Sequence, residues 1–155
     1  MIKIFQQFLA QVIFGDEELS LEMIEIDKRD ENSKGFKAVK VTLSEAIEEC
    51  FQQIVISNES RRPNPLWSVL YTLTGKCYAF NGIQRTADAN SRKVREMIAR
   101  YVRKRVSGEK KSALGNKSDL LSLFLDSPEI FTEEFIIDEL VDFLVAGTQT
   151  TQYVT

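Results

Sequence analysis

The sequence predicts a single all-α domain. Apolar residues recur at three- and four-residue steps in several separate segments, which is the spacing of a helix that buries one face. No segment shows a convincing alternation of apolar and polar residues, the pattern of a strand with one buried face. The 155 residues are 43% apolar and 28% charged, so the chain has enough apolar material for a core and is unlike a disordered or fibrous protein.

Capping residues position the first two of six expected helices. The first helix covers residues 2–14 and ends at Gly15, a residue type that favours helix C-termini. The second begins where Thr42 and Glu45 have the spacing of a capping box, and it runs to about residue 57. Between them, the stretch from Asp27 to Lys40 is crowded with charge and is expected to form an exposed loop or a short irregular hairpin.

The other four helices are expected at residues 65–73, 86–106, 119–125 and 132–155. Pro65 suits the first turn of a helix, and Pro128 follows the end of the short third one in this group. The helix over 86–106 has arginines and lysines opposite an apolar face. Thr132 is the expected cap of the last helix, and Glu133 in its first turn suits the positive end of the helix dipole.

Composition excludes several kinds of catalytic and metal site. The chain has no histidine, so a self-contained Ser-His-Asp, Cys-His or histidine-metal site is ruled out. Its two cysteines, Cys50 and Cys77, are too few for a disulfide framework, which favours an intracellular, reducing compartment. Both are expected to be buried core residues. No apolar run reaches the roughly 18 residues that a membrane helix needs, and the N-terminus lacks the features of a signal peptide.

Charge is divided unevenly along the chain. Residues 84–111 carry ten Lys and Arg against three acids, whereas residues 118–155 carry eight acids and no Lys or Arg. We expect these two stretches to face different neighbours. One function open at this point is a small all-helical interaction domain whose basic helix binds an acidic partner. No recognised nucleic-acid motif accompanies that helix, so nucleic acid is not the expected partner.

The last expected helix carries an unusual group of residues. It is apolar around most of its circumference, with a narrow polar stripe at Glu134, Asp138 and Asp142, and is expected to be mostly buried. Within it the sequence turns to Ala146-Gly147-Thr148-Gln149-Thr150-Thr151, although glycine and threonine are poor helix formers. Either the small pair is a close packing contact with another helix, or it lets a ligand approach the helix backbone.

This run closely resembles the central I helix of cytochromes P-450, whose pattern is Ala/Gly-Gly-x-Asp/Glu-Thr-Thr/Ser, and five of the six positions match. The segments that strengthen the resemblance are Asp119-Leu120-Leu121, Phe131 to Glu134 and Ile137 to Leu140. More loosely, Val12 to Gly15 is similar to the end of the family's E helix, and Arg85 to Arg105 is similar to its G helix. Residues 1–155 thus resemble an internal part of a cytochrome P-450 domain that ends within the I helix.

The resemblance implies a haem-dependent monooxygenase, which inserts one oxygen atom of dioxygen into a small organic substrate and receives electrons from a reductase. In this family the motif helix crosses the distal face of the haem, an iron protoporphyrin IX. The resemblance gives Thr150 the role of holding water that delivers protons to the oxygen. It assigns Ala146 and Gly147 to the groove beside the oxygen, with Val145 and Thr151 on the same haem and substrate face.

Two features depart from the family pattern. Gln149 stands where most members carry an acid that relays protons, and an amide cannot take up or release a proton near neutral pH, so slower or less coupled turnover is expected. The family's haem-ligating cysteine lies in a Phe-x-x-Gly-x-x-x-Cys-x-Gly loop downstream of the motif helix, and this sequence has no such loop. The chain alone is therefore expected to hold neither haem nor another metal and to be inactive. Anchoring of the implied full-length enzyme to the endoplasmic reticulum membrane, with the domain facing the cytosol, stays open.

Overall fold

A computed structural model describes residues 2–30, 35–61, 65–74, 79, 81–114 and 119–152. In chain order its elements are α1 (Ile2–Phe14), the 3₁₀ helix η1 (Glu17–Leu21), β1 (Met23–Arg29), β2 (Phe36–Thr42), α2 (Leu43–Arg61), α3 (Pro65–Thr74), α4 (Gly82–Val106), α5 (Leu120–Leu125) and α6 (Glu133–Gln152). The protein is mostly helical, as predicted, but the all-α prediction missed the two-stranded sheet formed by β1 and β2.

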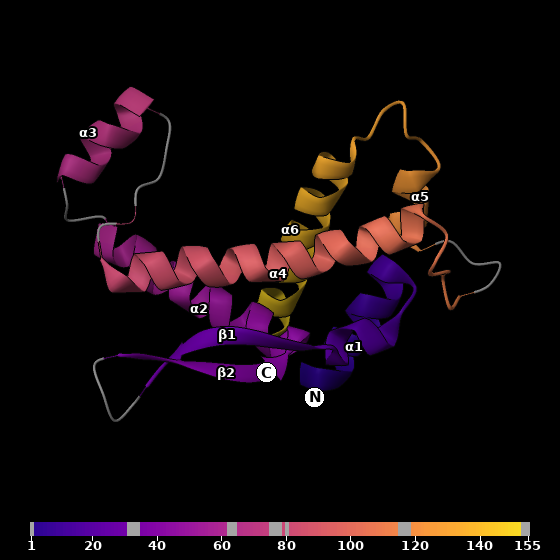
Figure 1. Cartoon of the computed structure of the whole chain (residues 1–155), viewed down its shortest axis with the longest axis horizontal. Helices are drawn as coiled ribbons and strands as arrows, with labels where there is room; N and C mark the ends of the chain where they lie inside the picture. The colour runs from indigo at the N-terminus through magenta and orange to yellow at the C-terminus, as the bar shows by residue number, and fades with distance from the viewer. Residues whose placement is uncertain are drawn as a thin grey trace.

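The long helix α4 is the centre of the fold (Figure 1). It packs against α2, α6 and β1, while α1 packs against η1, α5 and α6. The core forms where these elements meet, and its fully buried side chains include Phe14 of α1, Leu43 of α2, Ile98 of α4 and Leu140 of α6. In Figure 1, α3 stands apart at the far end of the molecule from α1.

A regular antiparallel hairpin lies where an exposed loop or a short irregular hairpin was expected from Asp27 to Lys40, so the hairpin alternative is confirmed but its irregularity is wrong. Its register is continuous, from Met23 opposite Thr42 to Arg29 opposite Phe36. The fully buried Ile26 lies opposite Val39, and this pair packs its strands onto the helices. The alternation is present but short, over Ile24-Glu25-Ile26 in one strand and Val39-Lys40-Val41 in the other, so it was not convincing in the sequence.

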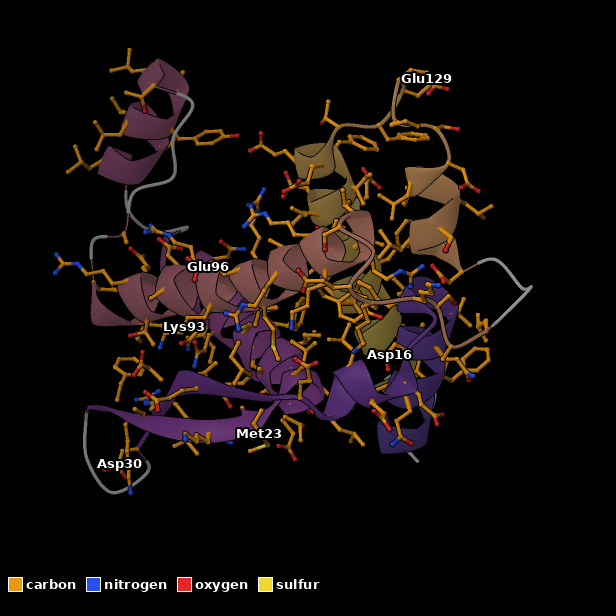
Figure 2. The ribbon with its side chains drawn as sticks, turned by 45° about the vertical axis from the view of Figure 1, so that its right-hand side comes forward. Asp16, Met23, Asp30, Lys93, Glu96 and Glu129 are labelled. Carbon is orange, nitrogen blue, oxygen red and sulfur yellow. The ribbon has the colours of Figure 1, made fainter. Side chains whose placement is uncertain are left out.

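Buried amides hold the hairpin to α2 and α4. Asn90 of α4 is fully buried and pairs with Asp27 as a neighbouring strand would, accepting from its backbone N–H at 2.9 Å and donating to its carbonyl at 2.8 Å. The Gln53 side chain of α2 also donates to that carbonyl, at 3.0 Å. Lys93 of α4 points toward the hairpin in Figure 2 and pairs with the Asp27 carboxylate at 3.0 Å. Because an unpaired buried amide is costly, this network specifies where the hairpin docks.

Local capping signals are confirmed. The backbone N–H of Thr42 donates to the Glu45 carboxylate at 3.1 Å, and the N–H of Glu45 donates to the Thr42 hydroxyl at 3.3 Å, which completes the predicted capping box. The N–H of Phe135 donates to the Thr132 hydroxyl at 3.3 Å, so α6 begins where predicted. Two helices are longer than predicted: α4 begins at Gly82 after the cap Asn81, and α2 continues to Arg61. The predicted end of the last helix, residues 153–155, lies outside the described residues.

Candidate functional site

Ion pairs join the first half of α6 to the basic helix α4. The Arg103 Nε atom lies 2.9 Å from a Glu133 carboxylate oxygen, and the Arg95 Nε atom lies 2.8 Å from one of Asp138. The prediction that the basic and acidic stretches face different neighbours is therefore wrong, since they face each other. An interaction domain would bind an acidic partner through the basic surface of α4. Part of that surface is already ion-paired with acids of the same chain. Exposed pairs of this kind contribute at most about 1 kcal/mol each.

The two sides of α6 differ in how far they are covered. One side carries the buried residues Ile136, Ile137, Leu140 and Leu144, which belong to the core. On the other side, Phe143 is 46% exposed, and the polar stripe and Ala146 are exposed as well. The prediction of a mostly buried helix is wrong in extent, because the polar stripe, Phe143 and Ala146 are all exposed.

Gly147 lies on the covered side, against α1. An ideal Cβ atom built on this glycine would be 2.7 Å from Leu9 Cδ1 and 3.1 Å from Leu9 Cδ2. A larger side chain would therefore push Leu9 or the helix away. The absence of a side chain at Gly147 has a packing reason, which was one of the two interpretations open from the sequence.

The structure describes the side chains of Val145 and Ala146 but not those of the last motif residues. Ala146 is exposed on the uncovered side, whereas Val145 is half-buried and packs against the core. The helical backbone continues through Gln149, Thr150 and Thr151, but their side chains lie outside the described part. The structure thus brings Val145, Ala146 and Gly147 together on one turn, with different surroundings for each.

Cys50 is buried in α2, as predicted, and is only 5% exposed. Burial, together with the neighbouring Glu49 carboxylate, raises the pKa of the Cys50 thiol to about 12. It is therefore a neutral thiol at neutral pH and is suited neither to nucleophilic attack nor to binding a metal. Cys77 lies outside the described residues. Among the residues that are described, no group of three or more His, Cys, Asp and Glu side chains could hold a metal ion.

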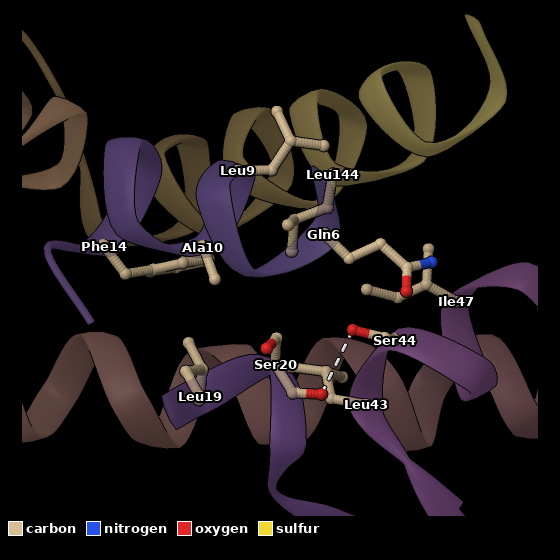
Figure 3. A pocket seen from close by; sticks show the side chains of 10 residues that line it. All are labelled: Gln6, Leu9, Ala10, Phe14, Leu19, Ser20, Leu43, Ser44, Ile47 and Leu144. Carbon is tan, nitrogen blue, oxygen red and sulfur yellow. Dashed lines mark hydrogen bonds between the residues drawn. The ribbon is translucent and has the colours of Figure 1, made fainter. Parts of the chain in front are cut away.

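Behind the covered side of α6 lies a cavity of about 10 Å³ between α1, η1, the start of α2 and Leu144 (Figure 3). Gln6, 6% exposed, reaches into it, and its Nε2 atom has no hydrogen-bond partner in the described part of the chain. In Figure 3 the Gln6 amide lies near Ser44, whose hydroxyl donates to the Ser20 carbonyl at 3.1 Å. This volume matches about one water molecule, so the cavity is too small for an organic substrate.

A buried ion pair at the C-terminal end of α4 was missed from the sequence. The Arg105 and Asp119 side chains are 6% and 0% exposed and lie 3.1 Å apart. Arg105 also donates to the Phe14 carbonyl at 2.6 Å, and Asp119 caps α5 by accepting from the backbone N–H of Ser122 at 2.7 Å. The pair thereby joins α1, α4 and α5. An aspartate before a short helix, as at Asp119, is a typical cap. The pair could not be predicted, because Arg105 lies 14 residues away along the chain.

Next to this pair, Gly15 ends α1 with a φ of +66°, a conformation that L side chains rarely adopt. A Cβ atom there would also lie 2.5 Å from an Asp119 carboxylate oxygen. The predicted C-terminal glycine is therefore required both by its backbone conformation and by the close approach of Asp119.

Among the helices that the structure describes, none combines the length and the apolar character needed to cross a membrane. Comparisons of the chain with protein-family models, with curated proteins and with solved structures found no match. The likeness to cytochromes P-450 therefore rests on the residues of the sequence alone.

Proposed function

We propose that the chain is the part of a haem-thiolate monooxygenase that runs from the E helix to the first half of the I helix, and that α6 is its oxygen-activation helix. The observation that carries this proposal is the uncovered side of α6 at the motif. Ala146 is exposed there, while the neighbouring Gly147 is closed off by Leu9. A helix side with a small residue beside the half-exposed Phe143 suits a flat, apolar group such as the face of a haem.

Helix geometry relates residue 150 to that uncovered side. Residue 150 follows Ala146 by four positions in a continuous helix, which corresponds to a rotation of about 40° and a rise of about 6 Å. In the proposed role, the Thr150 hydroxyl holds a water molecule and passes protons through its Oγ1 atom. Ala146 leaves space for oxygen and contacts the substrate. Gln149 orients water but supplies no proton.

The residues present fit one face of a haem but do not hold it. The thiolate that such a haem needs cannot come from Cys50, because that thiol is buried and its pKa is raised. A thiolate-ligated haem, held by the rest of the proposed enzyme, supplies the activation of dioxygen and the insertion of one oxygen atom into a small organic substrate, with electrons from a reductase. A haem titration of the isolated chain should accordingly give no thiolate-type absorption spectrum, and observing one would contradict this division of roles.

The role of Thr150 is tested in the intact enzyme with two substitutions of similar size. Thr150→Val removes the hydroxyl, and Thr150→Ser keeps it. We expect the valine variant to yield at least about tenfold less product per reducing equivalent, because a lost proton-transfer contribution is typically about 10²–10⁴-fold in rate, and the serine variant to stay near wild type. Substrate affinity should be similar in both. Equal product yields in the two variants would remove Thr150 from the mechanism.

Gln149 offers an independent test of the same helix. Gln149→Glu introduces a group that can exchange protons, so we expect the intact enzyme to form more product per reducing equivalent. An unchanged yield would mean that this position takes no part in proton delivery.

A further inference from the structure

Strand β2 has an edge that no other strand pairs with in the described part of the chain. In an antiparallel pair, alternate residues exchange backbone hydrogen bonds with the partner strand, and the residues between them direct their N–H and C=O groups away from it. The bond from the Asp30 N–H to the Gly35 carbonyl, at 3.2 Å, fixes this alternation in the hairpin. With the observed register, the backbone groups of Phe36, Ala38 and Lys40 therefore point outward from β2.

The two edges of the hairpin differ in how they are satisfied. On β1, Asp27 directs its backbone groups outward, and the Asn90 side chain binds both, at 2.9 and 2.8 Å. On β2, the outward backbone groups of Phe36, Ala38 and Lys40 have no hydrogen-bond partner among the described residues. Ala38 and Lys40 are exposed, and β2 lies on the side of the hairpin away from α4 in Figure 1. An exposed edge of this kind can pair with a strand of another chain.

A groove of about 400 Å³ lies between the hairpin and α2, next to this edge. Val39 and Val41 of β2 and Ile26 of β1 form its apolar wall. Successive side chains of a strand point to opposite faces, so a strand added beside β2 would turn every second side chain toward the groove. The groove therefore selects among the strands that could pair with the edge.

The charges of the groove favour a basic side chain. Glu45, Glu48 and Glu49 of α2 line it, against Lys28 of β1, which pairs with Glu49 at 3.3 Å. Lys37 of β2 lies on the same face of the hairpin. Three carboxylates thus stand against two ammonium groups, and Glu48 has no ion-pair partner in the part of the chain that the structure describes. One further positive charge would neutralise the groove.

We propose that the outer edge of β2 pairs with β2 of a second copy of this chain, antiparallel and around a two-fold axis at Ala38. Phe36 then lies opposite Lys40 of the other copy, and Lys37 lies opposite Val39, so Lys37 of each copy enters the acidic groove of the other. Every outward backbone group of these strands is satisfied. The pairing is the same in both directions and closes as a dimer, since a buried amide already occupies the outer edge of β1.

The side chains of β2 specify this register. Lysines on an edge strand ordinarily oppose self-pairing, because two identical strands can bring like charges together. A two-fold axis at Lys37 or at Lys40 would place two lysines directly opposite each other. An axis at Val39 would require the Thr42 N–H, which already donates to Glu45 at 3.1 Å. The axis at Ala38 avoids both conflicts, and the interface does not depend on the function proposed for α6.

Sedimentation velocity of the 155-residue chain over a concentration series tests the dimer. We expect a shift from monomer to dimer without larger assemblies. Hydrogen exchange locates the interface: the N–H groups of Ala38 and Lys40 should exchange more slowly as the dimer forms, whereas that of Val39, already bonded within the hairpin, should not change. A chain that stays monomeric up to about 1 mM, or that grows beyond a dimer, would overturn the proposal.

Proline substitutions compare the two edges of the hairpin. Ala38→Pro removes an outward N–H, a change that an edge strand tolerates. We expect the dimer dissociation constant to rise at least about tenfold, because both backbone hydrogen bonds at the axis are lost. Glu25→Pro removes an outward N–H from β1 and should leave the constant unchanged, with circular dichroism showing that both variants fold. An unchanged constant in Ala38→Pro would place any dimer interface elsewhere and contradict the proposal.

Charge reversal tests the contact with the groove. Lys37→Glu should raise the dimer dissociation constant about tenfold, and adding Glu48→Lys should recover much of the loss, whereas Arg92→Glu on the exposed surface of α4 should have no effect. Failure of Glu48→Lys to compensate would contradict the assignment of Lys37 to the groove. Binding of a synthetic peptide of residues 36–42 to a chain that itself stays monomeric would show that the edge receives a different strand, and would also overturn the proposal.

Discussion

The two sides of α6 have almost opposite surroundings, although they belong to one helix. The covered side is bound to its neighbours by apolar contacts and by the close approach of Gly147 to Leu9. On the other side, Phe143 and Ala146 are exposed. Adjacent small residues of one motif therefore lie in different surroundings. Gly147 lies against Leu9, whereas Ala146 is exposed.

The largest effect is expected at the buried ion pair that joins α1, α4 and α5. Asp119→Ala leaves the Arg105 guanidinium buried without its partner, so we expect the free energy of unfolding to fall by about 3–5 kcal/mol. Asp138→Ala removes an exposed partner of Arg95 instead and should cost less than about 1 kcal/mol. Urea denaturation measures both. Similar losses in the two variants would mean that the buried pair contributes no more than an exposed one.

The same pair predicts how stability depends on pH. Burial raises the pKa of Asp119, but hydrogen bonds from Ser112, from the backbone N–H of Ser122 and from Arg105 outweigh it and hold that pKa below its ordinary value. A carboxyl with a depressed folded-state pKa stabilises the protein above its unfolded pKa, and this contribution is lost as the pH falls below about 4. As the pH falls from neutral to below about 4, the free energy of unfolding of Asp119→Asn should therefore decrease less than that of the wild type. Parallel pH profiles would contradict the assignment.

Two truncations compare the sides of α6 directly. Leu140 is fully buried, so Leu140→Ala should lower the free energy of unfolding by about 2–5 kcal/mol. Phe143 is 46% exposed, and we expect Phe143→Ala to cost about 1 kcal/mol or less, although it removes a larger side chain. Equal losses would show that the second side is covered in solution, and the contrast between the two sides would disappear.

Gly147 and Ala146 provide a matched pair at neighbouring positions. Gly147→Val should cost about 1–3 kcal/mol, because its side chain would overlap Leu9. Ala146→Val should cost no more than the difference in helix propensity, below about 0.7 kcal/mol. Adding Leu9→Ala should relieve much of the strain of Gly147→Val, measured as a double-mutant cycle. If the two changes are simply additive, Leu9 is not the cause.

The smallest effect is expected at Gln6. If one water molecule occupies the small cavity and satisfies the Gln6 amide, Gln6→Met should change the free energy of unfolding by less than about 1 kcal/mol. A clear gain in thermal stability would instead show that the amide is unpaired, since an apolar side chain of similar shape then removes a desolvation cost.

Much of the helical structure could be predicted because its signals are local. The capping box of Thr42 and Glu45, the cap Thr132 and the C-terminal Gly15 each act within a few residues, and each lies where it was predicted. A hairpin was expected only as an irregular, exposed alternative to a loop, because the pairs that stabilise it join residues on two strands, such as Ile26 and Val39. Pairing of this kind is stabilised across strands and has only a weak signal in one segment.

The candidate site could be predicted only in part. The motif from Val145 to Thr151 was visible in the sequence, and Cys50 was correctly expected in the core. The matching of α4 arginines with α6 acids was not foreseen, because charge counts along a chain do not say which helices become neighbours. A groove between α4, α5 and the start of α6 was not foreseen either, since its walls come from three separate helices.

Most helix ends and the residues of the motif could be predicted from the sequence, because caps and helical periodicity depend on neighbours along the chain. Three features depended on the packed structure: Gly147 faces Leu9 while Ala146 is exposed, Arg105 is buried against Asp119, and a groove opens at the start of α6. These features depend on which helix surfaces meet in space, and one helical pattern is compatible with several such arrangements until the other elements pack against it.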